Sequence, residues 1–285
     1  MQPPPSERAR FLHVIVGGLV VMCAAMGGMG CTNPSLPPGT YSSFGTIDTI
    51  ATADVPRDSV LAVLARMNRT AFDSAFARLD EYAVTRRVRT EQLDTTGATT
   101  AYRSLTLRYP PGSAPGTVQR ADSAGTFREG GVFSAITPTQ QRTAMPANVA
   151  AQALADQPAY LAPRTKEAYR YALRRDSLLD GTPVLVVEAK ARSDERGADQ
   201  DIRYARLTID RASNELVGLT TARSSRILLF RENSQLTVRL RPAPDDTWVP
   251  HLTRFRALVD VPFRTARQFR TVSAYYGYEG MRTDS

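Results

Sequence analysis

Alternation of apolar and polar residues from Glu167 to Tyr278 is the feature that most limits how this chain folds. Leu207 and Ile209 alternate with polar neighbours, and similar alternations recur between turn-forming segments along the whole stretch. A period of two places apolar side chains on one face of a strand and polar side chains on the other. The sequence therefore predicts an antiparallel sheet that buries one face against helices of the same chain or against a hydrophobic ligand.

Turn signals divide the chain into strands. Asp180-Gly181 is a favourable hairpin turn, and three further strands are predicted upstream, beginning at Tyr82, over 102–109 and over 116–127. The predicted strands of the alternating stretch are 167–177, 182–192, 201–210, 215–223, 226–232, 234–241, 247–258 and 266–278. The sequence thus predicts about eleven strands.

Two segments depart from the strand pattern. Apolar residues at helical spacing over 58–79 predict helices, with Asp58 or Thr70 as an N-cap. These helices are the natural cover for the apolar face of the sheet. Residues 134–165 break the strand rhythm again, and Pro146 suits the first turn of a helix. This insertion is predicted to lie on the concave side, either as a packing helix or as a mobile gate.

The N-terminal thirty residues have the pattern of an export signal. Two arginines precede an uncharged, apolar run over 11–30, which leaves an uncleaved membrane anchor as the alternative. Gly28-Met29-Gly30-Cys31 resembles the bacterial lipobox, although leucine is usual where Gly28 stands. The other cysteine, Cys23, lies in the part predicted to be removed, so Cys31 has no disulfide partner. Acylation explains Cys31 best, and a plain thiol after an ordinary cleavage site is the alternative.

These features predict three parts: a lipoprotein-type signal peptide at 1–30, a flexible tether at 31–56 and one folded domain at 57–285. Two or more acyl chains give stable membrane anchoring where one chain does not. Thr32 stands where aspartate is the familiar signal for retention in the inner membrane. We therefore expect a lipid-anchored protein of the bacterial cell envelope, at the outer membrane and facing the periplasm.

The positive charge is almost entirely arginine. The formal net charge is +8, and Lys166 and Lys190 are the only lysines. This scattered excess is compatible with binding to anionic lipid head groups or polymers, and also with ordinary solvated strand faces. Export and the dispersal of the arginines argue against nucleic acid as a partner.

The sequence gives little sign of catalysis. His251 is the only histidine outside the signal segment, and no serine elbow, cysteine or metal-ligand spacing accompanies it. Phosphate-loop and dinucleotide glycine patterns do not occur. We therefore predict a protein that is not an enzyme and has no metal and no cofactor. An exported hydrolase is a further alternative, which would need a cleft of converging polar groups around His251.

Five aromatic residues are candidates for lining a hydrophobic cavity, with packing in the core as the alternative for each. Trp248 is the sole tryptophan, and the proline two residues later suits a strand near an edge or rim. The candidates are Tyr169, Tyr171, Trp248, Phe269 and Tyr275.

The order of these motifs resembles the LolA/LolB-like family of bacterial outer-membrane lipoprotein-sorting proteins over about residues 57–278. The motifs that carry the resemblance are Tyr169-x-Tyr171, Asp180-Gly181, Leu207-x-Ile209-Asp210 and Trp248-Val249-Pro250. It implies an incomplete, half β-barrel of about eleven strands wrapped around a few helices, whose inner surface receives acyl chains. An acylated N-terminus resembles the membrane-anchored receptor branch of that family more than its soluble carriers.

Two functional hypotheses follow. In the first, an envelope lipoprotein binds or passes an amphipathic or acylated ligand, either a lipid or a lipoprotein, in a hydrophobic half-barrel without catalysis. This hypothesis predicts an apolar cavity that is open at one side. In the second, a structural or adaptor lipoprotein has a self-filled core and binds a protein or an anionic envelope polymer with its basic outer face. Under both hypotheses we expect a monomer.

Overall fold

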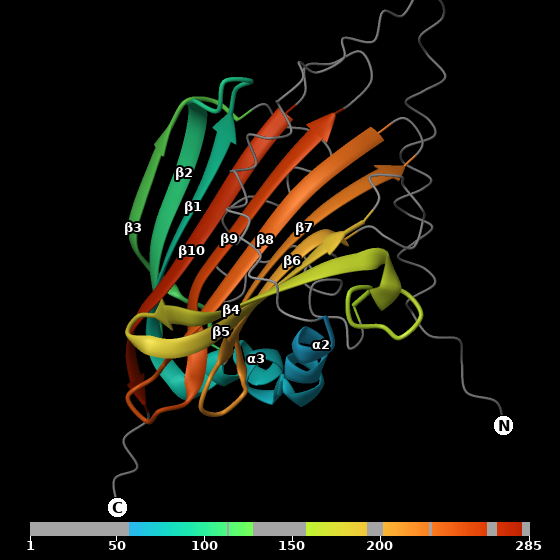
Figure 1. Cartoon of the computed structure of the whole chain (residues 1–285). Coiled ribbons are helices and arrows are strands. Elements are labelled where there is room, and N and C mark those ends of the chain that lie inside the picture. The colour runs from blue at the N-terminus through green and yellow to red at the C-terminus, as the bar shows by residue number, and fades with distance from the viewer. Residues whose placement is uncertain are drawn as a thin grey trace, which may run out of the picture. The chain divides into compact units, whose positions relative to one another are not determined.

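Strand pairing dominates the computed structural model, which describes residues 57–112, 114–127, 158–192, 202–227, 230–260 and 267–280. Within these ranges ten strands form one antiparallel sheet in the order β3-β2-β1-β10-β9-β8-β7-β6-β5-β4 (Figure 1). Their bounds are β1 Tyr82–Leu93, β2 Thr99–Tyr109, β3 Thr117–Ala124, β4 Tyr169–Leu179, β5 Thr182–Ala191, β6 Ile202–Asp210, β7 Leu216–Ile227, β8 Phe230–Pro242, β9 Trp248–Asp260 and β10 Arg267–Gly280. The sheet is open, because β3 and β4 lie at its two edges.

Pairing of the last strand with the first joins the two ends of the described chain. Strands β4 to β10 follow one another as neighbours, and β10 then pairs with β1. In this pairing Arg86 lies opposite Tyr275, and Glu91 lies opposite Arg270. The sheet twists strongly, so that β1 to β3 run upright in Figure 1 while β4 and β5 run across the view.

Three short helical elements, α2 Arg57–Arg66, α3 Thr70–Ser74 and η1 Ala77–Glu81, precede the sheet. Their principal contacts join α2 to β4, α3 to β7, and η1 to β1 and β9. Figure 1 shows α2 and α3 together near the end of the sheet where β4 and β5 cross the view. The Asn68 N–H donates to the Asn214 carbonyl (2.9 Å), and the Leu216 N–H donates to the Asn68 carbonyl (2.8 Å). These two hydrogen bonds attach the segment between α2 and α3 to the turn between β6 and β7.

The sheet has an apolar inner face and a polar outer face, because residues directly opposite each other in antiparallel strands point to the same side. A large core cluster joins α2 and α3 to the inner face of β4 to β9, and it includes Phe72, Leu207 and Leu219. A small core cluster joins η1 to the inner face of β1, β2 and β10, and it includes Val88. Phe76 packs against both clusters. The helices therefore pack against part of the inner face, near one end of the sheet.

The prediction of an antiparallel open sheet is confirmed, but the strand count differs. Asp180 (φ 49°) and Gly181 (φ 88°) form the predicted hairpin turn, which requires positive φ at both central positions. The prediction of separate strands at 215–223, 226–232 and 234–241 is wrong. Ile227 of β7 pairs with Phe230 of β8, so the middle segment belongs to the tip of one long hairpin. The described residues therefore form ten strands.

The start of α3 also differs from the prediction. The residue before α3 is Arg69, and no side-chain hydrogen bond is made at this N-cap position. Instead, Asn68 Oδ1 accepts a hydrogen bond from the backbone N–H of Thr70 (2.9 Å). Thr70 is thus the first residue of the helix, and the capping oxygen comes from two residues earlier. The predicted signal peptide, the tether and the helix expected after Pro146 lie outside the described residues.

Within the described ranges, no helix has the length and apolar character needed to cross a membrane.

Candidate functional site

Small side chains form a group on the inner face across β5 to β9. Ala189 lies directly opposite Ala205, and Ala205 lies opposite Thr221. Ser234 and Ala257 form a further opposite pair on β8 and β9. None of these five residues is more than 3% exposed. Because small side chains leave space above a sheet that Leu or Phe would fill, we call these five residues the floor.

Aromatic side chains border the floor on both sides. On β4, Tyr171 lies opposite the floor residue Ala189, and Tyr169 is two positions away on the same face. On β10, Phe269 lies opposite the floor residue Ala257. The pairing of distant strands thus brings three of the five candidate aromatic residues to the borders of one inner-face region.

A segment before β4 packs onto the inner face through Tyr160. We call residues 158–168 the Tyr160 segment; its last turn is η3, Lys166–Ala168. The ring of Tyr160 is 2% exposed and meets Tyr169 edge-to-face, with 6.4 Å between ring centroids. The Tyr171 hydroxyl lies 2.7 Å from the Tyr160 carbonyl and 3.1 Å from the Lys166 carbonyl. Burial raises the pKa of Tyr160, so its phenol remains neutral.

The borders of the floor are themselves tightly packed. The hydroxyl of Tyr169 donates to the Ile202 carbonyl (2.7 Å), and its side chain has no exposed surface. Phe269 is 2% exposed. A ligand can therefore reach these rings only when neighbouring side chains move.

The other two candidate aromatic residues lie away from the floor. Trp248 is half-buried at the start of β9, where it packs against the large core cluster. Tyr275 is 1% exposed and belongs to the small core cluster, in which its ring lies edge-to-face with Phe76 at 6.5 Å. The structure thus separates Trp248 and Tyr275 from Tyr169, Tyr171 and Phe269.

A buried arginine lies on the inner face beside Tyr275. Arg86 has no exposed surface, its Nη2 donates to Ser273 Oγ (3.0 Å), and its guanidinium lies 5.9 Å from the centroid of the Tyr275 ring. Further along the same two strands, the hydroxyls of Thr90 and Thr271 are hydrogen-bonded at 2.9 Å. The inner face of β1 and β10 therefore carries polar side chains among the apolar ones. Sequence reasoning missed Arg86, although its place between two inner-face valines of β1 was a signal.

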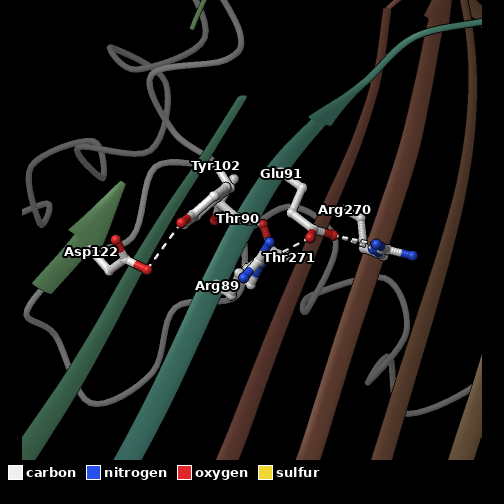
Figure 2. Close-up of polar contacts among 7 residues, drawn as sticks. All are labelled: Arg89, Thr90, Glu91, Tyr102, Asp122, Arg270 and Thr271. Carbon is white, nitrogen blue, oxygen red and sulfur yellow. Dashed lines mark hydrogen bonds and ion pairs between the residues drawn. The ribbon is translucent and has the colours of Figure 1, made fainter. Parts of the chain in front are cut away.

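On the outer face, two arginines from different strands hold the buried carboxylate of Glu91 (Figure 2). Its Oε1 accepts from Arg89 Nε (2.8 Å), and its Oε2 accepts from Arg270 Nε (2.5 Å). The Arg89 guanidinium also lies 4.0 Å from the ring centroid of Tyr102. The Tyr102 hydroxyl donates to Asp122 (3.0 Å), and this bond to a carboxylate raises the pKa of Tyr102. The network ties together β3, β2, β1 and β10.

Exposed arginines occupy much of the remaining outer face. Alternation along β1 places Arg87 on the same side of the sheet as Arg89 and Glu91. The register between neighbouring strands assigns further exposed arginines to that same side. We call six of these residues the outer arginines: Arg87, Arg120, Arg170, Arg174, Arg239 and Arg254. Within the described residues none of the six forms an ion pair. The strand register thus places six of the scattered arginines on one face of the sheet.

His251 lies at an irregularity of β9. Leu240 pairs with Pro250 and Arg239 pairs with Leu252, so His251 is the extra residue of a bulge. Its Nδ1 is buried and has no hydrogen-bond partner in the part of the chain that the structure describes. Among those same residues, no group of three or more potential metal ligands occurs.

No protein-family model and no curated protein matches this chain. Solved structures similar to it include a domain named for outer membrane lipoprotein sorting from Vibrio parahaemolyticus, with 12% identity, a TM-score of 0.29, and coverage of 80% of this chain and 94% of that one. A DUF1329 family protein from Desulfovibrio piger has 11% identity, a TM-score of 0.27, and coverage of 81% and 95%. A LolA superfamily protein from Nitrosomonas europaea has 10% identity, a TM-score of 0.25, and coverage of 77% and 92%.

Proposed function

We propose that this protein binds an amphipathic ligand, a lipid or an acylated protein, on the inner face of its sheet and does not alter it chemically. The observation that supports this proposal is the floor of small side chains with Tyr169 and Tyr171 on one side and Phe269 on the other. Each methylene that leaves water contributes ~0.8 kcal/mol, so an acyl chain laid along the floor needs no polar group for its affinity.

The Tyr160 segment is the part that moves to admit the ligand. The floor and its borders are buried, and among the described residues the Tyr160 ring packs beside Tyr169 on this region of the inner face. The segment is held by the edge-to-face contact and by two bonds from the Tyr171 hydroxyl, while its end before β4 is also held by the Arg57–Glu167 ion pair (2.7 Å) and by the bond from the Arg192 N–H to the Ala168 carbonyl (2.8 Å). Displacement of Tyr160 would expose the ring of Tyr169 and open a path to Ala189.

The polar part of the inner face would receive the head group. Arg86, Thr90 and Thr271 lie on β1 and β10, on the same face as Phe269. A guanidinium and two hydroxyls suit a phosphate or carboxylate, or the backbone carbonyls of an acylated peptide. A ligand whose acyl chain lay on the floor of β5 to β9 and whose head group lay toward β10 and β1 would match both the floor and the polar side chains of the inner face.

A lipid-binding site of this kind requires an attachment that holds the protein close to a membrane. Acylation of Cys31 and export past the inner membrane would place the domain at 57–285 on a tether, at the periplasmic side of the outer membrane. We propose that the protein acts there as a monomer, since one sheet supplies both the floor and its borders.

Binding of a fluorescent fatty acid to the purified full chain tests this proposal. Ala205→Phe fills the centre of the floor and should abolish binding of the probe. Ala222→Phe is the matched control, because Ala222 lies opposite Tyr204 and Gln235 on the outer face of the neighbouring strand β7. Native mass spectrometry of the protein extracted from envelopes should show masses of bound lipid in the parent and in Ala222→Phe, and none in Ala205→Phe.

Tyr160→Ala provides a second variant in case Ala205→Phe does not fold. Loss of the Tyr160 ring should speed uptake of the probe, because the ring packs beside Tyr169 at the proposed entrance. If neither the parent nor Tyr160→Ala binds the probe, and no lipid accompanies the native protein, the inner face is a self-filled core. The structural or adaptor alternative would then replace the present proposal.

A further inference from the structure

We propose that the outer arginines bind the anionic surface of a phospholipid membrane, so that the outer face of the sheet lies against a bilayer. This inference is independent of ligand binding on the inner face, because it uses the opposite side of the same strands.

Charge on the outer face is strongly one-sided. The six outer arginines and Lys190 are exposed, whereas Glu91 and Glu188 are buried and paired with arginines. Within the described chain, Asp122 and Glu279 are exposed acidic residues that strand pairing assigns to the outer face, and Glu279 forms an ion pair with Arg108. An excess of unpaired cations on one face produces a local positive potential that attracts an anionic surface.

Arginine is well matched to lipid phosphates. A guanidinium presents a planar fork of donors that binds two phosphate oxygens at once, whereas a lysine ammonium acts as a point charge. Of the seven exposed cations named above for the outer face, six are arginines and one is Lys190.

The outer arginines are distributed rather than convergent. They come from β3, β1, β9, β8 and β4, across the full width of the sheet. Arg239 and Arg254 are diagonal neighbours, since Arg254 lies opposite Thr237, two residues from Arg239. One small anion would need guanidinium groups that point at a common centre. A bilayer offers phosphates at many positions, and this arrangement fits it better.

The outer face has few side chains that could anchor a protein partner. Among the described residues the exposed large hydrophobic side chains are Val118, Leu178 and Tyr276, of which Tyr276 is assigned to the outer face by its pairing with Thr85. Protein interfaces usually depend on buried aromatic or aliphatic anchors at their centre. Association through dispersed charge with a single tyrosine is more typical of a membrane surface, where tyrosine suits the head-group region.

Co-sedimentation with vesicles tests the proposal on the full chain carrying Cys31→Ser, which removes the predicted acylation. Vesicles of phosphatidylcholine with phosphatidylglycerol should bind the protein more tightly than phosphatidylcholine alone, and salt should weaken the difference. Arg87→Gln, Arg239→Gln and Arg254→Gln together should lower the affinity for the anionic vesicles about a hundredfold, since each cation near an anionic surface contributes about a fivefold factor.

The matched control is Arg66→Gln, Arg164→Gln and Arg211→Gln together, which removes the same charge from exposed positions outside the outer face. This control should lose less than about tenfold, because charges that do not touch the surface are screened. Equal losses in the two triple variants would overturn the proposal. Binding to soluble polyphosphate without preference for the anionic vesicles would also overturn it, in favour of an anionic polymer.

Discussion

Arg270 of β10 lies directly opposite Arg256 of β9, so two like charges sit side by side on the outer face. Burial, and then the positive charge of Arg270, lower the pKa of Arg256. On the other side of Arg270, Glu91 of β1 accepts a hydrogen bond from its Nε at 2.5 Å. Glu91 therefore offsets a repulsion that the pairing of β9 and β10 creates.

Glu91→Gln should lower the free energy of unfolding by about 2–3 kcal/mol, because the change leaves two partly exposed arginines without their carboxylate. Urea denaturation measures this loss. Glu279→Gln is the control, since it breaks an exposed ion pair with Arg108 and should cost about 0.5 kcal/mol or less. A loss for Glu91→Gln no greater than that of the control would show that Glu91 does not offset the repulsion.

Local sequence signals predicted most of the strands. The Asp180-Gly181 turn and the alternation in β5 and β6 depend on neighbouring residues, and both are found in the structure. The prediction failed at the β7–β8 hairpin tip, where no glycine or proline marks the turn between Ile227 and Phe230.

Long-range pairing, in contrast, could not be read from the sequence. Glu91 and Arg270 are 179 positions apart, and only the pairing of β1 with β10 brings them together. The floor could not be predicted for the same reason. Only the pairing of β5 with β6 shows that Ala189 and Ala205 lie opposite each other. The aromatic candidates were chosen for composition, so their division between floor and core had to come from the structure.

Asp245 gives a prediction about pH. Hydrogen bonds from Thr247, first of all from its hydroxyl, and from the hydroxyl of Tyr82 (2.6 Å) lower the pKa of Asp245 from 3.8 to about 2. A carboxyl whose pKa is lower in the folded state stabilises the fold above its unfolded pKa, and this stability is lost as the pH falls through the folded pKa. The melting temperature should therefore fall between about pH 4 and pH 2, and less steeply in Asp245→Asn.

Asp246→Asn is the control for this experiment, because it removes a carboxylate from the same turn. Asp246 has φ 62°, a conformation that asparagine also adopts readily. Its pH profile should follow that of the parent. If Asp245→Asn also follows the parent profile, the bonds from Thr247 and Tyr82 do not contribute to acid stability.

Alanine substitutions at Gly125 and Gly97 distinguish the cost of backbone strain from the cost of a steric clash. Both have positive φ, but a Cβ at Gly125 would lie 2.3 Å from the Thr100 carbonyl oxygen, whereas a Cβ at Gly97 meets nothing within 4 Å. Gly97→Ala should cost about 1 kcal/mol for its backbone conformation. Gly125→Ala should cost clearly more, as measured by urea denaturation, because β2 or the end of β3 must shift. Equal costs would mean that the chain after β3 moves freely away from β2.

Acylation of Cys31 can be tested against the second cysteine of the chain. Cells that express the full chain should incorporate labelled palmitate into the parent and into Cys23→Ser, and not into Cys31→Ser, because the proposed lipobox ends at Cys31. Cys31→Ser should also leave the membrane fraction after a high-salt wash, because salt weakens the contacts of the outer arginines and the acyl chains that would anchor the protein are absent. Gly28→Leu restores the leucine that is usual in the lipobox and should increase the processed fraction. Label that persists in Cys31→Ser, or the absence of label from the parent, would rule out the proposed attachment at Cys31.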